Sequence, residues 1–168
     1  SPYVDADEDP RLGGDQITDE ELDARFATIA PATDWVRTFG CNADLEEVGQ
    51  LAHEAGMQAA IGAWLGPTKD DEYIAANQAQ INCLCARAAA GEVDLAVVGS
   101  EVLLRDDISE DELLQYIAEV RECLADAGVD IPVTYGEVYW VLLDHPDVLA
   151  AVDVVFVNYH PYWEGRAL

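Results

Sequence analysis

Hydrophobic and polar positions along this chain form blocks that predict buried strands separated by amphipathic helices. Short apolar runs rich in β-branched residues indicate strands of a parallel sheet, because the covering helices leave neither face of such a sheet to water. The runs span residues 34–39, 58–64, 95–98, 131–135 and 153–158. Apolar residues also recur at helical spacing over residues 19–30, 45–55, 70–90, 109–127 and 139–144.

Local signals mark where two of the helices begin. Thr18 with Glu21, and Ser109 with Glu112, have the spacing of a capping box, in which each side chain accepts a hydrogen bond from the other residue's backbone. The alternation of strand and helix predicts a parallel sheet with right-handed crossovers. Two architectures share this pattern. A doubly wound five-stranded sheet fits the 168 residues, whereas a (β/α)8 barrel needs about 250 residues and would be incomplete.

Composition restricts the partners of the chain. Its 51% of hydrophobic residues is ample for one core, so the 34 acidic and 8 basic residues, with a net charge of −26, belong on the surface. Such a surface repels nucleic acid and anionic membranes, and we expect neither as a partner. The sequence also has no apolar run long enough to cross a membrane. An acid-rich chain with one lysine resembles proteins of salt-loving organisms, in which salt screens the self-repulsion.

Neither the cysteines nor the acidic runs have the spacing of a metal site. Cys41, Cys83, Cys85 and Cys123 do not match a zinc site, and we expect them to be buried free thiols. The acidic run at residues 5–9 lacks the Gly and terminal Glu of a calcium loop. No metal and no cofactor is therefore predicted.

Polar and aromatic residues stand at the carboxyl end of each predicted strand, where α/β proteins collect their chemistry. In chain order they are Arg37, Trp64, Glu101, Glu137 and Asn158, followed by Tyr159 and His160. A doubly wound nucleotide binder would carry a glycine-rich phosphate loop, and the sequence has neither a G-x-G-x-x-G nor a Walker motif. Carboxylates beside Trp and Tyr favour an uncharged, hydroxyl-rich ligand such as a sugar, whose C–H faces stack on aromatic rings.

Six segments carry a resemblance to a known family. They are Ser1-Pro2-Tyr3, WVRTFG at 35–40, IGAWL at 61–65, VVGSEVLLR at 97–105, VTYGE at 133–137 and VNYHPYWEG at 157–165. In this order and spacing they resemble glycoside hydrolase family 17, the β-1,3-glucanases and related glucanosyltransferases, and in particular its bacterial and archaeal branch. The resemblance implies a secreted enzyme with a (β/α)8 barrel that acts on β-glucan polysaccharide or oligosaccharide. It also implies a retaining mechanism with one acid/base carboxylate and one nucleophilic carboxylate.

Glu101 matches the acid/base of the family, although by position alone it could be an ordinary loop carboxylate near a helix N-terminus. The family has Asn before its acid/base, and this Asn bonds the sugar 2-hydroxyl. Ser100 takes its place here, and its shorter hydroxyl predicts weakened turnover. The nucleophile is a Glu on the seventh family strand, to which no residue of the chain corresponds.

We therefore expect residues 1–168 to form a single partial barrel domain, made of family strands two to six. The first, seventh and eighth strands would be missing, and the open sheet edges would favour self-association.

The expected sugar-binding residues lie around Glu101. They are Tyr3, Arg37, Trp64, Ser100, Glu137, Asn158, Tyr159, Tyr162 and Trp163. Several have a second interpretation. Glu137 is either a sugar ligand, a stand-in second carboxylate or a solvated acid, and Arg37 either orients a carboxylate or pairs with a surface acid. The aromatic residues either stack on sugar rings or pack beneath loops.

Other functions also fit the sequence. The chain could be a catalytically inactive carbohydrate-binding relative, a truncated fragment without function, or a free-standing doubly wound domain with no sugar function. Of the histidines, His53 and His145 are expected to be ordinary surface residues, and His160 lies nearer the site.

Overall fold

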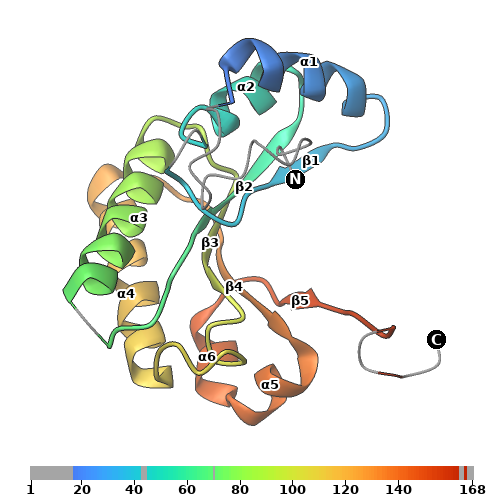
Figure 1. Cartoon of the computed structure of the whole chain (residues 1–168). Coiled ribbons are helices and arrows are strands. Elements are labelled where there is room, and N and C mark those ends of the chain that lie inside the picture. The colour runs from blue at the N-terminus through green and yellow to red at the C-terminus, as the bar shows by residue number, and fades with distance from the viewer. Residues whose placement is uncertain (1–16, 43–44, 70, 163–164, 166–168) are drawn as a thin grey trace.

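The computed structural model describes residues 17–42, 45–69, 71–162 and 165. Its framework is a curled parallel sheet with the strand order β1-β2-β3-β4-β5 (Figure 1). The strands are β1 (Trp35–Arg37), β2 (Gln58–Ala63), β3 (Leu95–Ser100), β4 (Val133–Val138) and β5 (Phe156–Asn158). A doubly wound sheet reverses its strand order at a switch point, and this sheet does not. Consecutive order with helical crossovers is that of a barrel, and the fold is a partial (β/α)8 barrel, as predicted.

Helices lie along the outer side of the curl (Figure 1). They are α1 (Asp19–Ile29), α2 (Val48–Glu54), α3 (Asp71–Ala89), α4 (Glu110–Ala127), α5 (Tyr139–Asp144) and α6 (Pro146–Ala151). Both predicted capping boxes are formed, at Thr18 before α1 and at Ser109 before α4. Helix α4 ends at Gly128, whose φ of 68° is the left-handed conformation that glycine adopts without penalty. These boundaries follow from local backbone chemistry and are confirmed.

The core lies between the helices and the convex face of the sheet. Successive strand residues point to opposite faces, and alternate residues of β2, β3 and β4 join the core. They are Ala59, Ile61, Ala63, Ala96, Val98, Val133 and Tyr135. Gly62 and Gly136 lie between them on the other face, where Gly62 lets the backbone of Thr38 and Phe39 approach closely and Gly136 leaves room for the Arg37 side chain. Helices α3 and α4 cover this core with Leu84, Leu113 and Ile117, all fully buried.

The two outermost strands are shorter than predicted. β1 and β5 contain three residues each, where the apolar runs span six. In the part of the chain that the structure describes, each is hydrogen-bonded to one neighbouring strand, so fewer of its residues are fixed by pairing. In contrast, β4 continues through Gly136 and Glu137 to Val138, beyond the predicted end at residue 135, because its end pairs with β5 from Gly136 to Val138.

The cysteine prediction is wrong. Cys41 is bonded to Cys83 and Cys85 to Cys123, and no described cysteine is free. Cys83 and Cys85 stand two residues apart on α3 and therefore face different neighbours, the loop after β1 and helix α4. The partners are 42 and 38 residues away, so only the packing of the helices reveals the pairing. Disulfides are typical of proteins that fold outside the reducing cytosol.

Within the described ranges, no helix is both long and apolar enough to span a membrane.

We expect this 168-residue chain to self-associate when it is expressed alone. Among the described residues, β1 and β5 have no strand on their outer sides. Trp35, Val155 and Val157 at these edges are exposed, which favours pairing with a second copy. Light scattering at low and high salt measures the mass. Lysine on an edge strand blocks such pairing, so the Val155→Lys/Val157→Lys variant should lose pairing through β5 and show a lower mean mass than the wild type. A wild-type chain that is monomeric in both salts would contradict the prediction.

Candidate active site

Glu101 follows a distortion at the end of β3. The register between β3 and β4 shifts between Val97 and Ser100, and Gly99 in this interval has a φ of 81°. Such bulges re-aim the side chains that follow them. Glu101 itself has a φ of 57°, a left-handed conformation that costs a residue with a Cβ about 1–2 kcal/mol. Its backbone N–H donates to the Gly136 carbonyl at 2.7 Å, which holds it there.

Three strands bring side chains together around this carboxylate. Asn158 at the end of β5 donates from Nδ2 to Glu101 Oε1 at 2.8 Å. Arg37 of β1 donates from Nη1 to Asn158 Oδ1 at 3.1 Å and from Nη2 to Ser100 Oγ at 3.1 Å. Because Arg37 occupies the amide oxygen of Asn158, the amide nitrogen must face Glu101. Arg37 thus orients the carboxylate through Asn158 and does not bond it directly.

The Arg37 guanidinium crosses the concave face of the sheet. It lies between two rings, 4.5 Å from the centroid of Phe39 and 4.4 Å from that of Phe156. Burial lowers the pKa of Arg37 from its usual value, and the negative charge of Glu101 partly opposes this. Gly136 makes the passage possible, because a Cβ at this position would stand 2.8 Å from Arg37 Nη2.

The structure places Glu137 differently from the prediction, which had it facing the site. Tyr135 of β4 joins the helix-side core, and Glu137, two residues further, points to the same side. Its side chain is fully buried, whereas Gly136 between them faces Arg37. The prediction that Glu137 contacts sugar therefore has no support from its surroundings in this structure. Ser100 is buried as well, with its hydroxyl bonded to Arg37.

Exposed aromatic rings lie at the strand ends. Trp64 is 44% exposed, Tyr159 53% and Tyr162 86%. Trp64 packs edge-on against Phe39 and carries the Arg105 guanidinium 4.6 Å from its ring centroid. Their exposure leaves ring surface for a sugar, and stacking stays a prediction. Tyr3 and Trp163, also expected in the site, lie outside the described residues.

Two residues near the site have partners that the sequence analysis did not identify. His160 Nε2 lies 4.0 Å from Glu101 Oε1, a partner that nothing in the sequence indicated. Arg105 donates to the carbonyls of Ser100 and Leu65 and to Asp107, so it ties the loop after β3 to the end of β2. Arg105 belongs to the VVGSEVLLR segment, but the motif does not indicate where the Arg105 side chain points.

The other two histidines bind acids away from Glu101. His53 Nε2 lies 2.8 Å from Asp94 and His145 Nδ1 2.9 Å from Glu110. Over residues 17–42, 45–69, 71–162 and 165, no three His, Cys, Asp or Glu side chains are placed to hold a metal ion.

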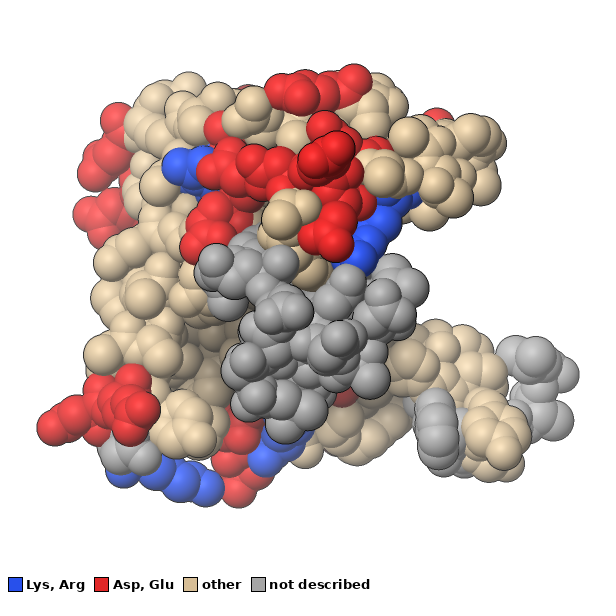
Figure 2. Space-filling view, turned by 45° about the horizontal axis from the view of Figure 1, so that its top comes forward, with Lys and Arg blue, Asp and Glu red and all other residues tan. Residues whose placement is uncertain are grey.

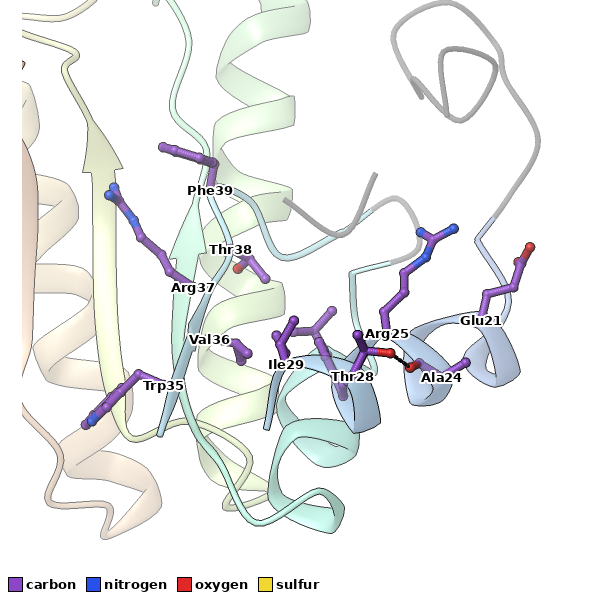
Figure 3. A pocket seen from close by; sticks show the side chains of 12 residues that line it. Glu21, Ala24, Arg25, Thr28, Ile29, Trp35, Val36, Arg37, Thr38 and Phe39 are labelled. Carbon is purple, nitrogen blue, oxygen red and sulfur yellow. Dashed lines mark hydrogen bonds between the residues drawn. The ribbon is translucent and has the colours of Figure 1, made fainter. Parts of the chain in front are cut away.

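A cavity of about 800 Å³ lies between α1 and the edge strand β1. Figure 3 shows Trp35, Arg37 and Phe39 on one side of this strand, and Val36 and Thr38 on the side of α1. Residues of α1 and β1 supply most of its lining, and Glu101 and Asn158 are not part of it. The cavity therefore lies at the edge of the sheet, and it meets the site around Glu101 at Arg37, which belongs to both.

A carboxylate oriented by an amide, with exposed aromatic rings nearby, at the carboxyl end of barrel strands is an arrangement suited to cleaving glycosidic bonds. Residues 3–167 match the family model of the BtgE/BtgC glycoside hydrolase domain. The chain belongs to this family.

Similar proteins agree with this assignment. The chain is 32% identical to a glucan 1,3-beta-glucosidase of Schizosaccharomyces pombe, over 90% of this chain and 48% of the relative. It is 29% identical to the glucan 1,3-beta-glucosidase of Saccharomyces cerevisiae, over 76% and 42%. It thus spans about half the length of the curated relatives it matches.

Among solved structures, it is similar to the glycoside hydrolase family 17 beta-1,3-glucanosyltransferase from Rhizomucor miehei. The TM-score is 0.75 at 28% identity, over 89% of this chain and 54% of that one. An active-site mutant of the same enzyme, in complex with laminaritriose, gives a TM-score of 0.74 at 29% identity. The resemblance to family 17 is confirmed, while the bacterial and archaeal branch stays a prediction.

Proposed function

We propose that this chain supplies the acid/base part of a retaining glycosidase or transglycosylase that acts on β-1,3-glucan. The observation that carries the proposal is the hydrogen-bonded set of Glu101, Asn158, Arg37 and Ser100, drawn from three strands of the partial barrel. The glucan specificity is taken from the relatives, which are glucan 1,3-beta-glucosidases and a beta-1,3-glucanosyltransferase.

Glu101 acts first as an acid in this mechanism. Its Oε1 accepts the Asn158 N–H, so the proton of the neutral acid is carried on Oε2, from which it passes to the glycosidic oxygen. A second carboxylate attacks the anomeric carbon, and Glu101, now ionised, takes a proton from the incoming water or sugar. We propose that the second carboxylate comes from outside residues 1–168.

A second candidate function is carbohydrate binding without turnover. It is favoured by Ser100, which stands where the family has the Asn that bonds the sugar 2-hydroxyl. The Ser100 side chain is buried beneath Arg37, to which its hydroxyl is hydrogen-bonded, and this burial keeps the hydroxyl from the sugar. Interactions with this hydroxyl strengthen in the transition state, and their loss would weaken catalysis more than binding.

We further propose that the protein works outside the cell and in high salt. Two disulfides suit an oxidising compartment. Figure 2 shows broad patches of Asp and Glu with few Lys and Arg on one face of the molecule, and the net charge is −26. Screening by salt relieves the repulsion within such a surface.

The test of function is hydrolysis of laminarin at molar salt by the protein expressed from its complete gene. Proton NMR of the first products identifies the anomer, and retention of the β-configuration is expected. A β-1,4-linked oligosaccharide of similar length is the control substrate and should remain intact. Inverted products would contradict the retaining mechanism, and laminarin binding without any turnover would support the second candidate.

A further inference from the structure

Two buried side chains of β4 lie directly beneath the loop that carries Glu101. This loop, residues 101–107, is here called the acid loop. Tyr135 is 1% exposed and Glu137 is fully buried. Neither is needed in the proposed chemistry, and an ionisable group is costly to bury unless all its oxygens are hydrogen-bonded. The contacts of Glu137 therefore show what its carboxylate does.

Tyr135 and Glu137 are both hydrogen-bonded to the backbone of the acid loop. The Leu103 N–H donates to the Tyr135 hydroxyl at 3.1 Å, and the Leu104 N–H donates to Glu137 Oε2 at 3.2 Å. The Tyr135 hydroxyl in turn donates to Glu137 Oε2. The Val138 N–H donates to Glu137 Oε1 at 2.8 Å. Both carboxylate oxygens thus face protein donors, and two of these connections end on consecutive amides of the acid loop.

The acid loop needs such support because its backbone is strained. Glu101 and Asp106 have φ values of 57° and 54°, and non-glycine residues keep this conformation only where the surroundings enforce it. Within the loop, the Arg105 N–H donates to the Glu101 carbonyl at 3.0 Å. The bonds that the Leu103 and Leu104 N–H groups donate to Tyr135 and Glu137 fix two residues inside this turn. Burial, and next the bond to Glu137, raise the pKa of Tyr135, which keeps its hydroxyl protonated.

We propose that Glu137, together with Tyr135, is a positioning residue that holds the acid loop so that Glu101 meets the glycosidic oxygen. The pair acts from the helix side of β4, while Arg37 and Asn158 act from the concave side, and Glu101 is fixed between them. Glu137 does not touch sugar in this arrangement. The effect of the pair on catalysis rests on the proposed function, whereas its hydrogen bonds to the acid loop are independent of that function.

The test uses two single variants of the full chain, Glu137→Gln and Tyr135→Phe. Three donors converge on the Glu137 carboxylate, and Gln offers one acceptor oxygen, so a donor of the loop or strand loses its partner. We expect kcat on laminarin to fall by about 100-fold, the effect of roughly 1 Å of misplacement, with KM nearly unchanged. Amide hydrogen exchange at Leu103 and Leu104 should become faster than in the wild type.

Thr134→Val is the matched control. Thr134 is also fully buried on β4, but its hydroxyl donates to the Val154 carbonyl and makes no bond to the acid loop. This variant should lose stability while kcat per folded molecule and exchange in the loop stay as in the wild type.

The outcomes separate the two proposals. A raised KM with unchanged kcat in Glu137→Gln would indicate that Glu137 contacts the sugar directly, and it would overturn the inference. Unchanged kcat with only a lower melting temperature would reduce it to a structural role. If the wild type does not turn over laminarin, the proposed function fails. Exchange at Leu103 and Leu104 then decides by itself whether Glu137 holds the loop.

Discussion

Replacing Glu101 by Gln is expected to lower kcat on laminarin by about 10²–10⁴-fold, the usual contribution of a general acid. Gln has the shape of Glu and keeps an oxygen for the Asn158 N–H, but it cannot deliver a proton to the glycosidic oxygen. KM should therefore change little. The loss should shrink for an aryl glucoside with a good leaving group, because such a group departs without protonation.

The control for this variant is Glu110→Gln at the start of α4. Glu110 bonds His145 at 2.9 Å and lies outside the hydrogen-bonded set around Glu101. Its replacement removes one negative charge from the same region of the chain without removing the acid. Undiminished turnover in Glu101→Gln, measured beside this control, would refute the acid/base role.

Removing the disulfide between Cys85 and Cys123 is expected to lower the free energy of unfolding by about 4 kcal/mol. The bond closes a loop of 38 residues, and the chain-entropy estimate for a loop of this length gives this value. Urea denaturation of the Cys85→Ala/Cys123→Ala variant measures it. Because the bond joins α3 to α4 on the outer side, kcat per folded molecule should be retained.

The other disulfide separates stability from function. Cys41 follows β1, and its N–H donates to Gln80 Oε1 at 2.8 Å, the same oxygen that accepts the Trp64 N–H at 3.2 Å. Breaking the bond to Cys83 should therefore cost a similar free energy and also loosen Trp64, with a higher KM for glucan. Equal urea midpoints for the oxidised and reduced wild type would contradict the predicted loss of stability, and an unchanged KM would contradict the effect on Trp64.

Local patterns in the sequence determined the elements and the end of the sheet where the site lies. The capping boxes at Thr18 and Ser109 and the ending at Gly128 depend on residues within one turn, so they could be predicted. The gathering of Arg37, Glu101 and Asn158 could be expected as well, because the carboxyl ends of parallel strands meet at one mouth. The order and spacing of the motifs were sufficient to recognise the family.

Only the tertiary structure decided how these residues are used. The disulfides join positions 42 and 38 residues apart, and no local pattern specifies such pairs. The hydrogen bond between Glu137 and Leu104 depends on how the acid loop folds back over β4. The route of Arg37 to Asn158 depends on Gly136 leaving space, 99 residues further along. Backbone periodicity is local and can be read from the sequence, whereas the partner of a side chain depends on how distant elements pack.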